Sequence, residues 1–256
     1  MATAHPATDL SGKTALITGA SKGLGKAMAA ALAEAGASVA LVARDSEKLE
    51  AVRAEIEAAG GRAKTFTADV THEEQVNTLK DKVAAQLGNV QILINNAGIN
   101  LRKNLIEFSL EEWRSVMDTN LTSVFLVCRA FVPQMRGTGY GRIINMSSIM
   151  SHVSLPGRSA YSSSKTALLG LNRALALELA GDGVTVNGIS PGPFGTEMNQ
   201  AIMHNPEANA QFLANLPVGR WGKVEEVGSL ARFLCSDAAG FITGTDILID
   251  GGWTAR

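Results

Sequence analysis

Short apolar runs alternate with longer amphipathic segments along most of this chain. The first run, KTALIT at residues 13–18, is aliphatic and β-branched and is followed by glycine, as expected for a strand buried on both faces. Comparable runs follow at residues 38–43, 62–68, 90–94, 141–146, 184–189 and 246–249. Strands that alternate with helices are joined by right-handed crossovers and form a parallel sheet. The pattern therefore predicts an α/β protein of one domain, residues 1–256, with a doubly wound, parallel, seven-stranded sheet and helices on both faces.

The segments between these runs have helical periodicity and recognisable start and stop signals. Ser109 and Glu112 form a capping-box pattern, and Gly36 and Gly88 stand where helices should end. The expected helices cover residues 25–35, 45–59, 72–87, 109–136 and 161–180, and another begins near 224. Residues 193–217 interrupt the alternation, and we interpret them as an insertion that forms a substrate lid.

Composition and charge limit the classes of function. Of 256 residues, 46% are apolar and 18% are charged, and the net charge is −1, so nothing favours nucleic acid or an anionic membrane as a partner. Cys128 and Cys235 lie in apolar helical patterns and are expected to be buried free thiols. No apolar run is long enough for a membrane helix and the first residues do not resemble a signal peptide, which predicts a cytoplasmic protein. The four histidines lack metal-ligand spacing, so no metal is expected.

A glycine-rich turn joins the first predicted strand to the first helix. At this position an open parallel sheet presents strand ends and a helix N-terminus to a ligand, and glycines let backbone N–H groups approach a pyrophosphate. The spacing G-x-x-x-G-x-G differs from the usual dinucleotide fingerprint and lacks the ending of a P-loop, which disfavours a nucleotide triphosphatase. The turn predicts a Rossmann-type dinucleotide site made by Gly19, Ser21, Lys22, Gly23, Leu24 and Gly25.

The end of the second strand bears on the choice between NADP and NAD. A carboxylate there would bind the ribose 2′-hydroxyl of NAD, whereas arginine accommodates the 2′-phosphate of NADP. Arg44 follows the strand directly, and Lys22 in the turn adds a second positive charge. Asp45 is the residue that favours NAD instead, but we interpret it as a helix cap. The expected cofactor is NADP(H), with NAD(H) as the alternative.

Tyr161 and Lys165 are four residues apart at the start of a predicted helix. Residues with this spacing lie on one face, so the phenol and the ammonium should point into the same space. A nearby cation favours phenolate over phenol and should lower the pKa of Tyr161. A tyrosine in this state can exchange a proton with an alcohol or a ketone.

Three more polar or glycine-rich stretches follow predicted strands, at residues 95–98, 145–148 and 191–196. Together with Asn120, Tyr161 and Lys165, they occur in an order and at a spacing that resemble the short-chain dehydrogenase/reductase family in its compact, single-domain form. The resemblance extends from about residue 10 to residue 253. It implies hydride transfer between a nicotinamide and a carbonyl or secondary alcohol.

The resemblance also implies a role for each matching residue. Tyr161 would exchange the proton, Ser148 would hydrogen-bond the substrate oxygen, Lys165 would bind the nicotinamide ribose, and Asn120 would hold a water that links Lys165 to solvent. Alternatives are that Asn120 is an exposed helical residue and that Asn95 is purely architectural. The cofactor contacts implied beyond the glycine-rich turn and Arg44 are Asp69, Val70, Asn96, Ala97, Gly98, Tyr161, Lys165, Pro191, Gly192 and Thr196.

The substrate is less well defined by the sequence. Asn100, Arg102 and Lys103 follow the Asn-Asn-Ala-Gly turn in a pattern similar to the gluconate 5-dehydrogenase branch, which handles sugar acids, but solvated surface charge is an equal alternative. The chain also resembles 3-oxoacyl-acyl-carrier-protein reductases, and a third alternative is an NADP-binding regulatory protein without turnover. His152, Phe194 and Met198 are further candidates for substrate contact. His152 could instead be an exposed loop histidine, and Phe194 and Met198 could instead pack the insertion down. The family resemblance implies a homotetramer.

Overall fold

Seven parallel strands form one sheet in the order β3-β2-β1-β4-β5-β6-β7. The structure is a computed structural model that describes residues 8–255. The strands are β1 (Thr14–Thr18), β2 (Ser38–Ala43), β3 (Arg62–Thr67), β4 (Ile92–Asn95), β5 (Gly141–Met146), β6 (Val184–Pro191) and β7 (Asp246–Ile249). Because β1 lies between β2 and β4, the strand order reverses there, and ligands bind beyond the carboxyl ends of the strands at such a point.

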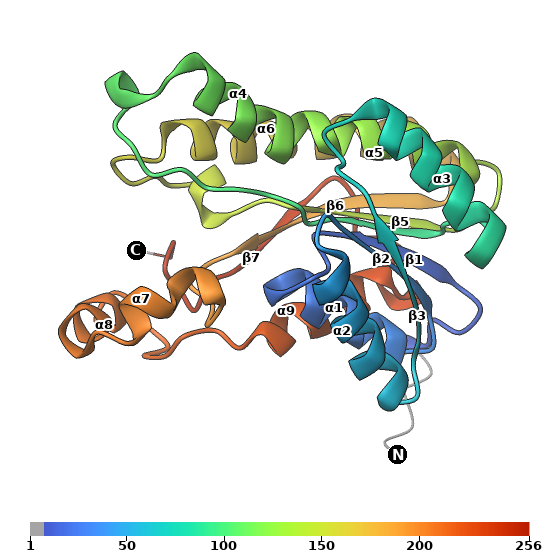
Figure 1. Ribbon diagram of the computed structural model, residues 1–256, viewed down its shortest axis with the longest axis horizontal. Coiled ribbons are helices and arrows are strands. Elements are labelled where there is room, and N and C mark those ends of the chain that lie inside the picture. Colours follow the sequence, from blue (N-terminus) through green and yellow to red (C-terminus); the bar gives the residue numbers. More distant parts are fainter. Residues whose placement is uncertain (1–7, 256) are drawn as a thin grey trace.

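Helices cover both faces of this sheet, which confirms the predicted doubly wound fold (Figure 1). On one face lie α1 (Gly23–Glu34), α2 (Ser46–Ala58) and α9 (Val224–Cys235). On the other lie α3 (Glu73–Leu87), α4 (Leu110–Met117), α5 (Ser123–Phe131) and α6 (Ser159–Leu179). Alternate strand residues supply the two cores: Ala15 and Ile17 of β1 pack on the α1 side, and Leu16 packs on the other. Both cysteines are buried and free, as predicted.

The helix expected over residues 109–136 is not uniform. The capping box of Ser109 and Glu112 is present, but a π-helical turn, η3 (Asp118–Thr122), separates α4 from α5. The 3-10 turn η4 (Val132–Gln134) contains Pro133, which lacks an N–H group and cannot continue the helical ladder. By length and composition alone the stretch 110–134 could cross a membrane, but here it lies beside α6 over the sheet (Figure 1).

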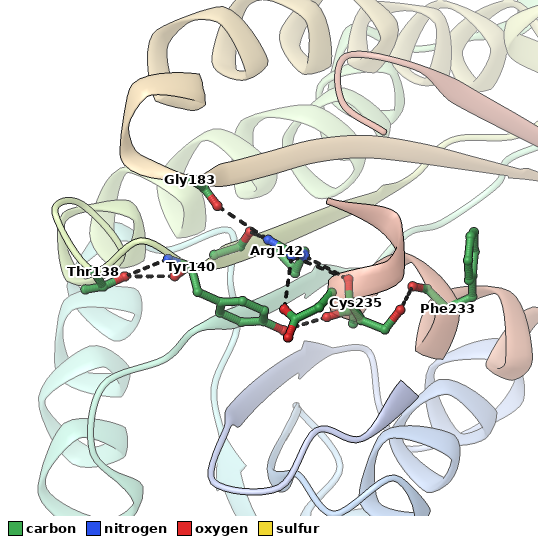
Figure 2. A network of polar contacts seen from close by, with 9 residues as sticks. Thr138, Tyr140, Arg142, Gly183, Phe233 and Cys235 are labelled. Atoms are coloured by element: carbon green, nitrogen blue, oxygen red, sulfur yellow. Dashed lines mark hydrogen bonds and ion pairs between the residues drawn. The ribbon is translucent and has the colours of Figure 1, made fainter. Parts of the chain in front are cut away.

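A buried arginine ties the amino end of β5 to two neighbouring segments (Figure 2). The guanidinium of Arg142, which is 4% exposed, donates to the carbonyls of Gly183 and Ser236 at 3.4 Å each. It also lies 4.3 Å from the centre of the Tyr140 ring, whose hydroxyl donates to the carbonyl of Cys235 at 2.5 Å. The network therefore joins β5 to the end of α9 and to the turn before β6.

The segment expected to be a lid, residues 193–217, lies outside the two helical layers, next to the carboxyl end of β6 (Figure 1). It contains η7 (Glu197–Asn199), α7 (Gln200–Met203) and α8 (Pro206–Leu213). Phe194 forms a β-bridge with Gly222, and the ring of Phe212 stacks on Trp221 with centroids 4.5 Å apart. These contacts attach the segment to the residues that precede α9.

Candidate active site

A cleft of about 820 Å³ opens along the carboxyl ends of the strands. Its walls come from the loops after six strands, from the start of α6 and from the segment after β6. Sixteen of the seventeen residues predicted to contact the cofactor line this one cleft: Gly19, Ser21, Lys22, Gly23, Leu24, Arg44, Asp69, Val70, Asn96, Ala97, Gly98, Tyr161, Lys165, Pro191, Gly192 and Thr196.

The remaining predicted residue, Gly25, lies beneath the glycine-rich turn. A Cβ atom at Gly25 would lie 2.3 Å from the carbonyl oxygen of Gly19, so no other residue fits while the turn keeps this shape. Gly19 and Gly23 have φ values of +66° and +55°, which favour glycine. No side chain caps the first turn of α1, so its N–H groups and the helix dipole face the cleft, an arrangement that suits a phosphate anion.

Asn96 holds the glycine-rich turn against the end of β4. Its amide donates to the carbonyls of Thr18 and Gly19 at 3.0 and 3.1 Å. The Thr18 hydroxyl in turn accepts from the N–H groups of Asn96 and Ala97 at 3.0 and 3.1 Å. The two loops that meet at the point of strand reversal are therefore joined by four hydrogen bonds.

Arg44 lies at the far end of the cleft with its side chain 75% exposed, 3.6 Å from the carboxylate of Asp69. Asp45 accepts a hydrogen bond from the backbone N–H of Lys48 at 3.1 Å, which confirms its interpretation as the cap of α2. The Lys48 ammonium lies 2.8 Å from the Asp45 carboxylate and also lines the cleft. Sequence reasoning missed Lys48. This residue stands three positions after the cap, on the first turn of α2, and this position places it beside Arg44, which precedes the helix.

Lys22 was expected to add positive charge beside Arg44. In the structure its ammonium lies 3.1 Å from the carboxylate of Glu197 in η7, with both side chains more than half exposed. The ion pair directs Lys22 to the predicted lid and partly neutralises it. Lys22 thus joins the glycine-rich turn to the segment after β6.

The opposite end of the cleft contains Tyr161, Lys165 and Ser148. The Lys165 ammonium is buried, donates to the carbonyl of Met146 at 2.6 Å and lies 5.9 Å from the centre of the Tyr161 ring. Burial lowers the pKa of Lys165 to about 8. The shared helical face predicted for the tyrosine and the lysine is therefore present.

The predicted direction of the Tyr161 pKa is wrong for this structure. Burial of the phenol raises its pKa, and this effect outweighs a hydrogen bond from Ser148 and the positive charge of Arg158, which both lower it. Lys165 does not contribute to the shift. The reason is that the ammonium is directed to the Met146 carbonyl and not to the phenol.

Of the two adjacent serines, Ser148 is the one that reaches Tyr161. It caps the 3-10 turn η5 (Ile149–Ser151) by accepting from the N–H of Met150 at 3.1 Å, and its own carbonyl accepts from the Ser190 hydroxyl at 2.9 Å. The Ser147 hydroxyl is buried and has no partner among the described residues. Ser148 is therefore placed beside Tyr161, and its hydrogen bond to the substrate oxygen stays a prediction.

Asn120 lies inside the π-helical turn and is fully buried, so the alternative of an exposed helical residue is wrong. Its amide donates to the Ile99 carbonyl at 2.9 Å and to the Ser164 hydroxyl at 3.0 Å, and its oxygen accepts from the Ile99 N–H at 2.8 Å. Asn120 therefore holds the loop after β4 against α6. The water-holding role stays a prediction.

Asn95 has the architectural role that was left open. Its amide donates to the side-chain oxygen of Asn145 at 2.8 Å, and the amide of Asn145 lies 2.6 Å from that of Asn172. This buried chain links β4, β5 and α6 below the floor of the cleft.

The residues expected to contact substrate have different positions. His152 does not line the cleft: its ring nitrogen Nε2 lies 2.7 Å from the carboxylate of Asp246, so the predicted substrate contact is not supported. Phe194 is 4% exposed and packs under Gly222 at the cleft wall, mainly as a packing residue. The Met198 side chain lies outside the described part of the chain. Asn100 and Arg102 lie on the loop after β4 and do not line the cleft.

Comparison with known proteins gives full-length matches. The family profile described as enoyl-(acyl carrier protein) reductase matches residues 19–254. Gluconate 5-dehydrogenase of Gluconobacter oxydans is 39% identical over 245 residues, 96% of each chain. The 3-oxoacyl-[acyl-carrier-protein] reductase FabG of Haemophilus influenzae is 37% identical over 95% of this chain and 98% of that protein. The chain belongs to the short-chain dehydrogenase/reductase family.

Solved structures of this family are similar over almost the whole chain. A putative gluconate dehydrogenase from Agrobacterium tumefaciens has a TM-score of 0.94 at 39% identity and covers 98% of this chain and 99% of its own. A gluconate 5-dehydrogenase from Burkholderia cenocepacia, in complex with NADP and tartrate, has a TM-score of 0.92 at 35% identity and 98% coverage of both chains. This short-chain dehydrogenase/reductase is thus an NAD(P)-dependent oxidoreductase and acts on a small-molecule substrate.

Proposed function

We propose that this enzyme uses NADP(H) to interconvert a carbonyl and a secondary alcohol on a keto-sugar acid or a similar polar ketone. The observation that carries the proposal is the position of Ser148, Tyr161 and Lys165 on the same cleft that presents the glycine-rich turn at its other end. A cofactor held by its phosphates at one end would place its reactive end beside a buried phenol.

The residues present fit a dinucleotide. The first turn of α1 offers uncapped N–H groups for a pyrophosphate. At the other end, a Cβ atom at Gly98 would lie 3.2 Å from the side-chain oxygen of Asn120 and 3.5 Å from the ammonium of Lys165. Glycine keeps this space above Lys165 open, so that the lysine can hydrogen-bond a ribose hydroxyl.

Preference for NADP(H) over NAD(H) is inferred from charge. Arg44 and Lys48 both line the end of the cleft that follows β2, and Asp45 is engaged as a helix cap. A guanidinium binds phosphate through two parallel hydrogen bonds, and an ammonium adds a point charge. Two solved relatives, the gluconate 5-dehydrogenase from Burkholderia cenocepacia and a putative one from Beutenbergia cavernae, contain NADP.

The chain's own residues can carry out the proton transfer. When bound, the reduced cofactor supplies a hydride to the carbonyl carbon. Ser148 and Tyr161 would hydrogen-bond the carbonyl oxygen and stabilise the negative charge that develops on it. Because burial raises the pKa of Tyr161, the phenol is protonated at neutral pH, as the donor in a reduction must be. Lys165 would bind the ribose hydroxyls of the nicotinamide.

A substrate panel with Tyr161→Phe tests this proposal. Oxidation of NADPH would be followed with keto-sugar acids, neutral ketoses and 3-oxoacyl thioesters. We expect the keto-sugar acids to give the highest kcat/KM and Tyr161→Phe to lower turnover by about 100-fold or more. Near-normal turnover by Tyr161→Phe would contradict the assigned acid.

The same panel separates the second candidate, a 3-oxoacyl-[acyl-carrier-protein] reductase. The 37% identity to FabG of Haemophilus influenzae over nearly the whole chain favours that candidate, since it is close to the identity to gluconate 5-dehydrogenase. A kcat/KM for 3-oxoacyl thioesters above that for every keto-sugar acid would select it.

We also propose a cytoplasmic homotetramer. Leu177 on α6 is 83% exposed, and Leu248 on β7 is 41% exposed, so each element presents apolar surface suited to a subunit contact. Cys128 and Cys235 are buried free thiols, as is usual in a reducing compartment. Light scattering after size-exclusion chromatography tests the assembly, and a monomer would contradict it; fractionation of the native cell tests the compartment.

A further inference from the structure

A buried carboxylate lies behind the loop that carries Ser148. Asp246 begins β7, and only 8% of its side chain is exposed. Its Oδ2 atom accepts a hydrogen bond from the Ser190 hydroxyl at 2.6 Å and lies 2.7 Å from Nε2 of His152. Its other oxygen, Oδ1, is buried and has no hydrogen-bond partner among residues 8–255. Burial of a carboxylate is costly, so the groups that meet at Oδ2 must offset a large desolvation penalty.

The strand next to β7 leaves room for this carboxylate. Gly188 of β6 is the register partner of Asp246, and a Cβ atom at Gly188 would lie 2.0 Å from Oδ1 of Asp246. Any larger residue at position 188 would therefore displace the carboxylate. Ser190 lies two residues further along β6, so its side chain is on the same face of the sheet as position 188. The pairing of the two strands thus places the carboxylate against the Ser190 hydroxyl.

The two groups that meet at Oδ2 lead to opposite ends of the turn η5. Ser148 is the N-cap residue of this turn, and His152 is its C-cap residue. The hydroxyl of Ser190, which is fully buried, donates to the Ser148 carbonyl at 2.9 Å as well as to Asp246, so its single proton is shared between two acceptors. The carboxylate therefore fixes the rotamer of Ser190 against the Ser148 carbonyl. In this way one oxygen of Asp246 holds the segment 148–152 at both ends.

The position of this turn decides where the Ser148 hydroxyl lies. That hydroxyl accepts from the N–H of Met150 at 3.1 Å, and the Ser148 carbonyl also accepts from the N–H of Ser151 at 2.8 Å. Both donors belong to η5, so a shift of the turn moves the hydroxyl that reaches Tyr161. A displacement of about 1 Å in a catalytic group can lower turnover by about 100-fold.

We propose that Asp246 is a positioning residue for Ser148 and acts through the Ser190 hydroxyl and the His152 ring. The inference rests on the proposed function, in which Ser148 hydrogen-bonds the substrate oxygen. Asp246, Ser190 and His152 do not line the cleft, so they act on the reaction only through other residues. Their removal should therefore slow the reaction of bound substrate and leave cofactor binding intact. The role also accounts for His152, whose predicted contact with substrate is not supported.

The kinetics of three variants test this hydrogen-bonded path. With NADPH and 5-ketogluconate, Asp246→Ala and Ser190→Ala should each lower kcat by about 10-fold or more, while the Kd for NADPH changes by less than about twofold. Asp246→Asn should keep kcat within about threefold of the wild type, because its amide can donate to Ser190 and to His152 and leave the Ser190 proton for the Ser148 carbonyl. An unchanged kcat in Asp246→Ala, or an equal loss in Asp246→Asn, would overturn the proposal.

A double variant and a matched control separate this path from general damage. If Asp246 acts through Ser190, the double alanine variant should lose less activity than the product of the two single losses, whereas a fully multiplicative loss would overturn the proposal. The control is Ser236→Ala, since Ser236 is as fully buried as Ser190 and its hydroxyl donates to the carbonyl of Phe233 at 2.6 Å, at the end of α9. This control should lower Tm and leave kcat unchanged. A loss of kcat equal to that of Ser190→Ala would show a general effect of deleting a buried hydroxyl and would also overturn the proposal.

Amide exchange tests the position of the turn without turnover. The N–H groups of residues 150–153 are all hydrogen-bonded to acceptors on residues 148 and 149. We expect deuterium exchange in a peptide over 148–153 to be about 10-fold faster in Asp246→Ala and in Ser190→Ala than in the wild type, and unchanged in Asp246→Asn. Unchanged exchange in Asp246→Ala would overturn the proposal. If exchange responds as expected but the wild type oxidises NADPH with no carbonyl, the proposed function alone is refuted.

Discussion

Replacing Lys165 by methionine is expected to stabilise the protein at neutral pH while removing activity. Lys165 is 4% exposed, and its ammonium donates a hydrogen bond to the carbonyl of Met146 at 2.6 Å. The difference between the ordinary lysine pKa of 10.5 and a pKa of about 8 corresponds to about 3 kcal/mol. Methionine removes this cost but leaves the Met146 carbonyl without its donor, which costs about 2 kcal/mol of stability. The net gain at pH 7 is therefore about 1 kcal/mol.

The pH dependence of this difference is the decisive part. Folded wild type releases the Lys165 proton near pH 8, whereas the unfolded chain keeps it until about pH 10.5. Between these values the unfolded chain binds more protons, so the free energy of unfolding of the wild type rises with pH. The contribution is fully present above the unfolded pKa and is lost as pH falls through the folded one. Lys165→Met lacks this contribution, so the excess of its free energy of unfolding over that of the wild type should decline by about 3 kcal/mol as pH rises across this window.

Urea unfolding at a fixed protein concentration, at several values from about pH 7 to about pH 10, measures this difference. Subtracting the variant from the wild type removes the contributions of all other titrating groups. Lys82→Met, on the exposed side of α3, is the matched control and should change stability by less than about 0.5 kcal/mol. Parallel curves for Lys165→Met and the wild type would refute the buried ammonium. Turnover of Lys165→Met should fall by about 100-fold or more at every pH.

Three further substitutions test other parts of the molecule. Arg44→Ala should raise KM for NADPH by about 10-fold or more and leave KM for NADH nearly unchanged. The control Arg53→Ala, elsewhere on α2, should alter neither KM, and equal effects of Arg44→Ala on both cofactors would contradict a 2′-phosphate contact. Gly25→Ala should abolish measurable NADPH binding in calorimetry, because a Cβ 2.3 Å from the carbonyl of Gly19 must displace the turn; wild-type affinity would refute this account. Arg142→Met should lower stability by about 3 kcal/mol in thermal unfolding, because buried carbonyls lose their donor, and an unchanged Tm would show that the network in Figure 2 contributes little.

The strands were predictable because each is a short apolar run between turn residues. Strands β2, β5 and β7 begin and end at the predicted residues. The start of β4 was less well predicted. Val90 is buried and Gln91 is partly buried, but both precede the strand, because the hydrogen-bonded register with β1 begins at Ile92. Burial alone does not distinguish a residue within a strand from a residue in the segment that leads into it.

The cofactor end of the site was predictable for a related reason. In a parallel sheet every strand ends at the same edge, so residues that follow strands meet whatever their distance in sequence. Lys48 was missed because its role depends on which side of α2 faces the cleft. The predicted direction of the Tyr161 pKa shift was wrong because helical spacing shows which way the Lys165 side chain points but not which carbonyl its ammonium reaches.

The π-helical turn at Asp118–Thr122 explains how Asn120 reaches the centre of the protein. Each residue of a regular helix advances about 100° around the axis, so the wider turn rotates the residues after it relative to those before it. Both α4 and α5 can therefore pack their apolar sides on the same layer while an amide enters the interior between them. The buried amide is tolerated because the Ile99 backbone and the Ser164 hydroxyl satisfy its donors and acceptor. Those same bonds hold the loop after β4, so Asn120 connects the position of α6 to the position of that loop.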